Sequence, residues 1–254
     1  MLAEIASAIM FYTRLPMPEG MPHSDEILNR SRTWFPLVGL IVGGIAAGIF
    51  AAAQLLWPSS VAFILSMAAT VLVTGAFHED GFADTCDGLG GGWTVEQKLT
   101  IMKDSRLGTY GAVGLAFMLG LKFVALAALT DLRVGSVAAL MVMTHAVSRQ
   151  FASTVIETAD YVADIDVSKV RPIANRRLSA RRQLVAWLIA GTGAVPVALL
   201  APRALIAIVV GAIVSWLFRG FCVRSIGGYT GDTLGATQQL SELTMLLAAV
   251  ALLV

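Results

Sequence analysis

Long apolar runs follow one another along this chain, separated by polar segments. The runs cover residues 36–57, 61–77, 109–130, 134–157, 183–201, 203–222 and 240–254, and each is about as long as a membrane helix or somewhat shorter. Pro58, Asp131 and Pro202 mark tight connections, whereas the other connections are longer and polar. The pattern predicts an all-α, polytopic bundle of about seven membrane spans, forming a single integral membrane domain over residues 1–254.

Composition supports the membrane prediction, since 57% of the residues are hydrophobic, only 14% are charged and the mean hydropathy is +0.76. The first eleven residues are too short and, at Glu4, too acidic for a cleaved signal, so an interfacial helix is expected. Cys86 and Cys222 provide no disulfide framework. We expect Cys86 and His78 to be bystanders, the lipid bilayer to be a partner, and nucleic acid not to be one.

Basic residues divide unequally between the two sides of the predicted spans. If the N-terminus is cytoplasmic, fourteen of the eighteen Lys and Arg residues fall on the cytoplasmic side and only Arg133 and Arg203 on the other. Lys122 and Arg149 lie inside spans. Because cytoplasmic loops are enriched in Lys and Arg, this partition predicts a cytoplasmic N-terminus and places the acidic and glycine-rich motifs on the cytoplasmic side.

An acidic string follows the second apolar run directly. Residues 78–87 read His-Glu-Asp-Gly-Phe-Ala-Asp-Thr-Cys-Asp and hold four carboxylates. If the apolar run continues as one helix, Asp80, Asp84 and Asp87 share a face, with Glu79 to one side. Like charges on one face repel unless a cation holds them together, and oxygen ligands favour Mg²⁺ or Mn²⁺. The string therefore predicts a divalent-metal site, with a solvated helix end as the alternative.

A second polar string, Lys103-Asp-Ser-Arg106, precedes the third apolar run, after residues 94–97, which have the spacing of a helix capping box. Lys103 and Arg106 suit phosphate oxygens, Ser105 can donate a hydrogen bond, and Asp104 adds a fifth carboxylate. The alternative is that Asp104 only pairs with its two basic neighbours at the membrane interface.

Two further segments contribute candidate binding groups. Residues 227–236 are rich in glycine; Gly231 can present its backbone N–H group to an anion, and Asp232 adds an acid. A plain connector is the alternative reading. Near the N-terminus, Arg14 offers a cation within Phe-Tyr-Thr-Arg-Leu-Pro.

Ionisable residues also occur inside the predicted spans. Lys122 lies in the third run, and His145 and Arg149 lie four residues apart in the fourth, on one helix face. Charged groups at such depth are functional candidates, and we expect Arg149 to contact substrate. The charged run over residues 160–182 is interpreted as a solvated loop above anionic lipid, or as a lid over a large anionic substrate.

Carboxylates, a divalent cation, basic side chains and glycine segments at one membrane face suit a diphosphate that an alcohol attacks at phosphorus. An acid not fully engaged by metal is the candidate general base. The sequence has no Walker loop and no Ser or Cys nucleophile arrangement, so ATP hydrolysis and acyl-enzyme chemistry are unsupported.

Five strings, in order, resemble the cobalamin synthase family, and they lie at residues 11–16, 35–39, 78–88, 102–111 and 230–236. The resemblance extends from residue 11 to about residue 242. It implies a multi-pass enzyme of the bacterial inner membrane whose active site faces the cytoplasm. Such an enzyme transfers the adenosylcobinamide-phosphate group of adenosylcobinamide-GDP to alpha-ribazole, or to its 5'-phosphate, and releases GMP with the help of Mg²⁺. This is the last assembly step of the cobalamin nucleotide loop.

The resemblance and the residue chemistry together assign roles. The expected metal ligands are Glu79, Asp80, Asp84, Asp87 and Asp104. The expected catalytic residues are Asp84, Asp87, Lys103 and Arg106, and the expected substrate-binding residues are Arg14, Ser105, Arg149, Gly231 and Asp232. Glu79 itself departs from the family pattern, in which an apolar or shorter acidic residue is common at this position.

Three other classes compare less well with the sequence. CDP-alcohol phosphotransferases also use an acidic membrane helix, but their Ala-Arg pair is replaced here by Ala83-Asp84, and the second half of their motif does not appear. Membrane prenyltransferases normally carry two separate Asp-rich helices. A cation transporter needs acids near the bilayer midplane, whereas these acids cluster at one face. A homo-oligomer is compatible with the sequence.

Overall fold

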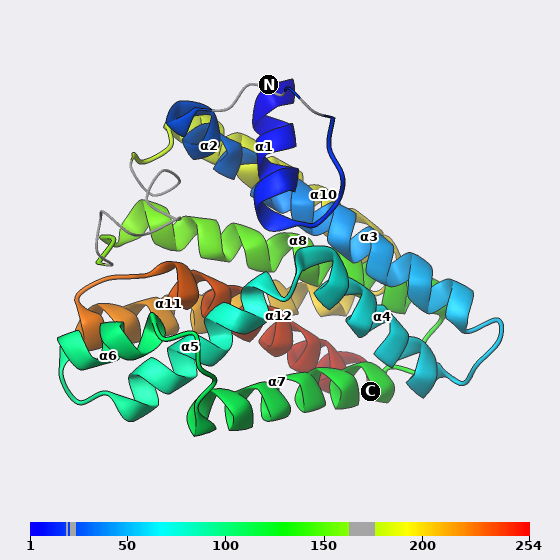
Figure 1. Cartoon of the computed structure of the whole chain (residues 1–254). Helices are drawn as coiled ribbons and strands as arrows, with labels where there is room; N and C mark the ends of the chain where they lie inside the picture. Colours follow the sequence, from blue (N-terminus) through cyan, green and yellow to red (C-terminus); the bar gives the residue numbers. More distant parts are fainter. Residues whose placement is uncertain (19, 21–23, 163–175) are drawn as a thin grey trace.

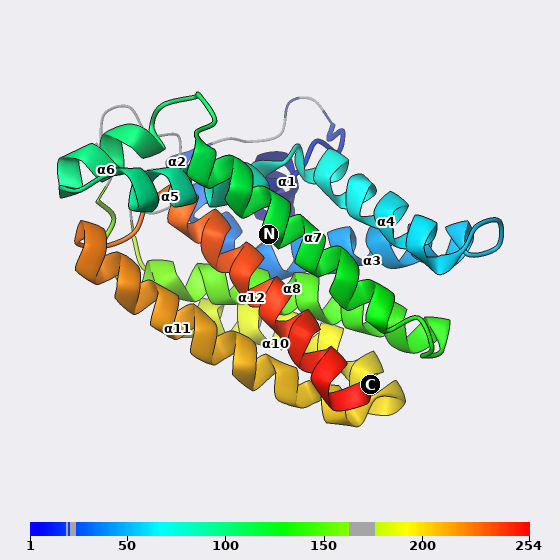
Figure 2. The same ribbon diagram turned by 90° about the horizontal axis from the view of Figure 1, so that it is seen from below.

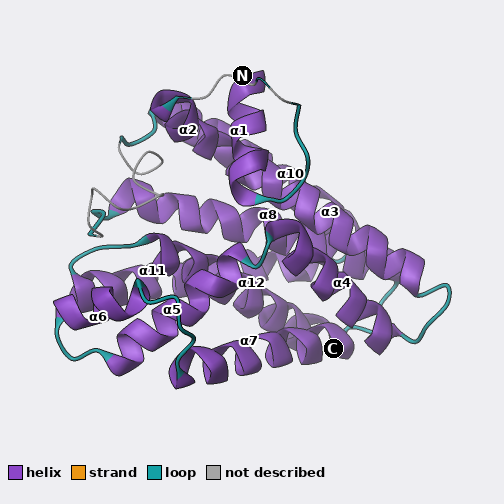
Figure 3. Ribbon diagram, viewed as in Figure 1, coloured by secondary structure: helices purple, strands orange, loops and turns teal. Residues whose placement is uncertain are grey.

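The computed structural model describes residues 1–18, 20, 24–162 and 176–254, and these residues are mainly helical (Figures 1 and 3). The first half contains α1 (Leu2–Tyr12), α2 (Asp25–Ser31), the 3-10 turn η1 (Arg32–Trp34), α3 (Phe35–Ala53), α4 (Ser59–Thr74), α5 (Phe77–Gly91) and α6 (Val95–Met102). The second half contains α7 (Thr109–Ala128), α8 (Val134–Thr158), α10 (Ala180–Leu200), the 3-10 turn η2 (Pro202–Leu205), α11 (Ile206–Ile226) and α12 (Gly231–Leu253). In this part of the chain, pairing of the strand type is limited to an isolated bridge between Tyr161 and Tyr229. The all-α prediction is confirmed.

Several helices are long and apolar enough to cross a membrane. Among the described residues there are five, or six if the bent pair α4 and α5 is one span, so the prediction of about seven spans is not confirmed. The helix that falls short is α8, because His145, Arg149 and Gln150 interrupt its apolar sequence. The cytoplasmic position of the N-terminus stays a prediction.

The second apolar run does not continue as one helix, which corrects the expectation for residues 61–87. The axes of α4 and α5 differ by 88°. Gly75 and Ala76, between them, have φ angles of 63° and 57°, in the left-handed region. This conformation is easy for glycine but costs an alanine about 1–2 kcal/mol. Because α5 turns away from α4 and carries four carboxylates, we treat it as lying outside the membrane-spanning segments.

The central helix of the bundle is α8, which packs against α3, α10 and α12. Gly39 and Gly43 allow this close approach, because a Cβ atom at either position would lie within 3.0 Å of the backbone of α8. On the other side of the bundle, α12 runs between α7 and α11 (Figure 2). The first turns of α7 and α12 lie beside α5 and α6 in both views, so the acidic helix meets the start of two membrane helices (Figures 1 and 2).

Candidate functional site

The acidic helix α5 packs closely on the first turns of α12. A Cβ atom on Gly81 would lie 3.0 Å from both the Cα atom and the carbonyl oxygen of Asp232, and one on Gly235 would lie 3.1 Å from the carbonyl oxygen of His78. Glycine at both positions allows the two backbones to approach this closely. The packing brings Asp232 beside the carboxylates of α5, from which it is far away in sequence.

The electrostatic centre of the site is Asp84, which is half-buried. Burial raises the pKa of Asp84 to about 7, and the negative charges of Asp232, Asp80 and Asp87 act in the same direction. Asp80 is exposed and Asp232 is half-buried, so both can reach a ligand from solvent. Four carboxylates from two helices therefore share one region, and their mutual repulsion favours a bound cation.

Asp87 has a different environment from Asp80 and Asp84. It is buried, and its carboxylate accepts hydrogen bonds from the backbone N–H groups of Gly108 and Gly111, each at 2.8 Å. These groups belong to the N-cap and first turn of α7, where backbone donors lack intrahelical partners. Asp87 therefore caps α7 from a neighbouring helix, and this contact aligns the carboxylate helix with α7.

Asp104 lies on the loop between α6 and α7 and binds Arg106. The side chain of Arg106 donates to both carboxylate oxygens of Asp104, with distances of 2.6 Å from Nη2 and 3.0 Å from Nε. The hydrogen bonds from the Arg106 side chain and backbone lower the pKa of Asp104 to about 2. Asp104 is not among the charges that act on Asp84. This contact agrees with the alternative interpretation of residues 103–106, in which Asp104 pairs with a basic neighbour.

The expected phosphate-binding groups lie around α5. Arg14 packs against the α4–α5 bend, since a Cβ atom on Gly75 would lie 2.4 Å from its Nε atom. Lys103, Ser105 and Arg106 are exposed before α7, in the loop that follows α6. The predicted capping box that opens α6 is confirmed.

The glycine-rich segment over residues 227–236 was expected to be a loop, but only part of it is one. Gly227 ends α11 with a φ of 85°, whereas Gly231 and Asp232 already belong to α12. Thr230 caps α12 by accepting a hydrogen bond from the N–H group of Thr233. Asp232 is consequently held on a helix rather than on a flexible connector.

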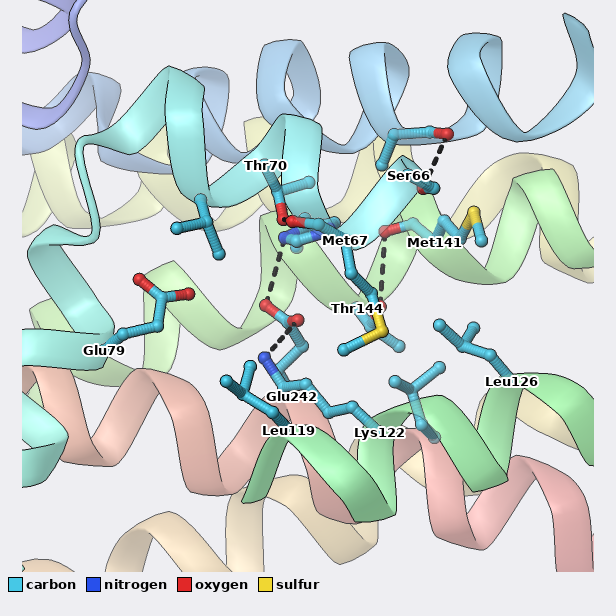
Figure 4. A pocket seen from close by; sticks show the side chains of 14 residues that line it. Ser66, Met67, Thr70, Glu79, Leu119, Lys122, Leu126, Met141, Thr144 and Glu242 are labelled. Atoms are coloured by element: carbon cyan, nitrogen blue, oxygen red, sulfur yellow. Dashed lines mark hydrogen bonds and ion pairs between the residues drawn. The ribbon is translucent and has the colours of Figure 1, made fainter. Parts of the chain in front are cut away.

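A buried polar network occupies the interior of the bundle (Figure 4). Glu242 of α12 accepts from Lys122 of α7 at 2.7 Å and lies 3.0 Å from Nδ1 of His145 on α8. Arg149, which we expected to contact substrate, is only 2% exposed and donates to the carbonyl oxygen of His145 at 3.0 Å. Arg149 lies with these interior groups rather than among the aspartates of α5.

Glu79 connects this network to the acidic helix. Gln239 accepts from Lys122 at 2.5 Å and donates to Oε1 of Glu79 at 3.0 Å. The second carboxylate oxygen, Oε2, is buried without a hydrogen-bond partner. Sequence reasoning expected Glu79 to support a metal and did not single out Glu242 or Gln239. An acid inside the last apolar run was the available signal for Glu242.

Chemically, the residues present fit a divalent cation. Asp80, Asp84 and Asp232 supply the hard oxygen atoms that Mg²⁺ prefers. Within the described ranges, however, no three acidic, histidine or cysteine side chains lie close enough to form a complete metal site. Mg²⁺ in phosphoryl-transfer enzymes is commonly bound by one or two carboxylates together with substrate phosphates and water. The arrangement suits a cation that arrives with a diphosphate.

Part of the charged run between α8 and α10 lies outside the described residues, namely residues 163–175, so neither the lipid interpretation nor the lid interpretation is tested. Of the described portion, Asp160 lies 3.9 Å from Arg177 across exposed surface.

Fold and site together define a helical membrane protein with a carboxylate cluster where a bent helix pair meets two membrane helices. The model of the cobalamin-5-phosphate synthase family matches residues 4–250. The chain belongs to this family.

Relatives named adenosylcobinamide-GDP ribazoletransferase support the assignment. The protein from Shewanella frigidimarina is 45% identical over 252 residues, covering 96% of this chain and 92% of its own. The one from Vibrio parahaemolyticus is 42% identical and covers 96% of this chain and 90% of its own, and the one from Leptothrix cholodnii is 46% identical with 93% and 90% covered. No solved structure matches the chain.

Proposed function

We propose that this chain transfers the adenosylcobinamide-phosphate group of adenosylcobinamide-GDP to alpha-ribazole or its 5'-phosphate and releases GMP. The family assignment and the names of the relatives support this reaction. The observation that carries the chemistry is the packing of Gly81 on Asp232, which adds a carboxylate from α12 to those of α5.

In the proposed site, Asp84, with Asp80 or Asp232, would hold Mg²⁺ together with the diphosphate. A bound Mg²⁺ neutralises phosphate charge and stabilises the GMP leaving group. Arg14, at the bend before α5, and Lys103 and Arg106, before α7, would contact phosphate oxygens, since guanidinium and ammonium groups donate several charge-assisted hydrogen bonds.

The bonding changes balance without any further reactant. A hydroxyl oxygen of alpha-ribazole forms a bond to the phosphorus that carries the cobinamide group. The bond from that phosphorus to the bridging oxygen breaks, and its electron pair leaves with GMP. A carboxylate of the cluster that is not fully engaged by the cation takes the hydroxyl proton.

The location of the reaction is part of the proposal. Five to six apolar helices within the described ranges support a membrane protein, and the partition of Lys and Arg supports a cytoplasmic N-terminus in the bacterial inner membrane. On this topology the acids of α5 and α12 face the cytoplasm, where nucleotide-linked substrates are available.

The test is GMP release by purified protein in detergent, supplied with adenosylcobinamide-GDP, alpha-ribazole and Mg²⁺. We expect release only when all three are present. Asp84→Asn should lower turnover about a hundredfold or more, because it removes one charge from the cation site. Asp131→Asn, at the far end of α7 from Asp87, is the matched control and should leave turnover unchanged.

Two results would contradict the proposal. One is CMP release from a CDP-alcohol with no GMP release from adenosylcobinamide-GDP, which would indicate a CDP-alcohol phosphotransferase. The other is movement of a labelled cation across proteoliposomes without consumption of a nucleotide-linked substrate, which would indicate a transporter.

A further inference from the structure

A cavity lined by aromatic side chains adjoins the carboxylate cluster. Its walls come from α1, α3, α5, α8 and α12, and its aromatic lining consists of Phe11, Tyr12, Phe35, Phe77 and His78. Four of the five strings that resemble the cobalamin synthase family contribute residues to it, although they are far apart in sequence. Neither the carboxylate cluster nor the buried polar network uses these side chains.

Three of the five rings, those of Tyr12, Phe35 and His78, are nearly parallel, whereas the rings of Phe11 and Phe77 stand edge-on to them. The rings of Phe35 and His78 are inclined by only 10° with their centroids 6.0 Å apart, and Tyr12 stacks on Phe35 at 4.0 Å. Aromatic faces in this orientation bind another flat ring by stacking, independently of its hydrogen-bonding pattern. The aromatic lining therefore suits a planar aromatic group better than a phosphate or a sugar.

His78 adds a polar group to this apolar lining. Its side chain is 2% exposed, and its Nε2 atom has no hydrogen-bond partner. Buried polar atoms in proteins are almost always hydrogen-bonded, so this orphan nitrogen in a cavity wall leaves a hydrogen-bonding position that a ligand can fill. A heteroaromatic base offers both a flat face and ring nitrogen atoms.

The cavity also lies next to the reacting groups. His78 precedes Asp80 by two residues on α5, and Gly231, which lines the cavity, directly precedes Asp232 on α12. Each separation along the helix is less than one turn, and a turn is about 5 Å long. A nucleoside with its base in the cavity would extend its ribose toward the acids.

We infer that this cavity binds the aromatic base of the acceptor nucleoside, alpha-ribazole, and so positions its ribose hydroxyl beside Asp80 and Asp232. The inference rests on the proposed function. The cavity is about 30 Å³, enough for one or two water molecules, so the base enters as the partly exposed rings of Phe11 and Phe77 rotate outward.

The test compares Phe77→Leu with Phe221→Leu. Phe77 is 37% exposed and Phe221, on α11 and outside the cavity, is 45% exposed, so neither substitution removes a fully buried side chain. Loss of this edge-on aromatic contact should raise the KM for alpha-ribazole about fivefold in Phe77→Leu and leave the KM for adenosylcobinamide-GDP within about twofold. Phe221→Leu should change neither constant.

A binding measurement separates this inference from the proposed reaction. Alpha-ribazole alone should raise the unfolding temperature of the wild-type protein in detergent, and Phe77→Leu should lose most of that shift. If GMP is not released but the shift and its loss are observed, the base site stands and the proposed function fails. If GMP is released but neither the alpha-ribazole KM nor the shift depends on Phe77, the proposed function stands and the base site is wrong. Equal changes in both KM values would also overturn it.

Discussion

The buried network around Glu242 should be the most sensitive point of the membrane interior. Glu242 is 4% exposed, and its carboxylate lies 2.7 Å from Nζ of Lys122, 3.0 Å from Nδ1 of His145 and 2.5 Å from Nε2 of Gln238. Nη1 of Arg149 is 3.9 Å away. One carboxylate therefore links polar side chains of three helices, α7, α8 and α12.

Glu242→Gln keeps the shape of this side chain and removes its charge. Lys122 and Arg149 would then remain inside the bundle without their counter-ion. Removing one partner of a buried ion pair costs about 3–5 kcal/mol, because the other charge is left uncompensated in a medium that solvates it poorly. Lys122→Met should cost less, since Glu242 keeps its contacts with His145 and Arg149.

The matched control is Glu26→Gln on α2, which breaks the exposed pair between Glu26 and Arg30. Such surface pairs contribute about 0.3–0.5 kcal/mol. Unfolding by SDS in mixed micelles, followed by circular dichroism, measures all three variants on one scale. If Glu242→Gln lies within about 0.5 kcal/mol of Glu26→Gln, the network does not stabilise the bundle and the reasoning is wrong.

Three further predictions concern the surroundings of α5. Gly111→Ala would place a methyl group 2.4 Å from Oδ2 of Asp87, so the unfolding temperature and turnover should both fall, whereas Gly120→Ala on the same helix, with open space around it, should change neither. Ala76→Gly should raise the free energy of unfolding by about 1 kcal/mol in the same SDS assay by relieving the left-handed backbone, and an unchanged value would show that the bend carries no strain. Because hydrogen bonds from Arg106 hold the pKa of Asp104 near 2, the contribution of this contact to folding should persist above the usual Asp range and disappear as the pH falls through about 2. Carbon NMR of a labelled Asp104 carboxyl, titrating near pH 4 instead, would contradict the contact.

The sequence predicted the helical class, the acidic helix and the capping box of α6 because each depends on local spacing. Periodicity and helix caps act over a few residues, and α5 and α6 contain them in full. The bend at Gly75 and Ala76 was missed, since nothing in an apolar run reveals that an alanine will adopt a positive φ. The structure there depends on Arg14, more than sixty residues earlier in the chain.

Contacts between distant segments account for the other differences. By its helical spacing Asp87 belongs to the same face as Asp80 and Asp84. Its carboxylate, however, accepts hydrogen bonds from backbone N–H groups at the N-terminus of α7. Asp232 was predicted to bind substrate from its glycine-rich segment, but its position beside the acids of α5 depends on the close contact with Gly81. His78 was expected to be a bystander. The sequence could not show the unpaired nitrogen or the aromatic cavity, because both result from the packing of α1, α3, α5 and α12.

The central claim is that Asp84, with Asp80 or Asp232, binds a divalent cation together with the diphosphate of the substrate. Electron paramagnetic resonance of Mn²⁺, used as a probe for Mg²⁺, tests it directly on the purified protein with and without adenosylcobinamide-GDP. We predict that the wild-type protein binds Mn²⁺ tightly only when adenosylcobinamide-GDP is present, and that Asp84→Asn loses this binding while Asp131→Asn keeps it. Equal Mn²⁺ binding by the wild-type protein and Asp84→Asn would contradict the account.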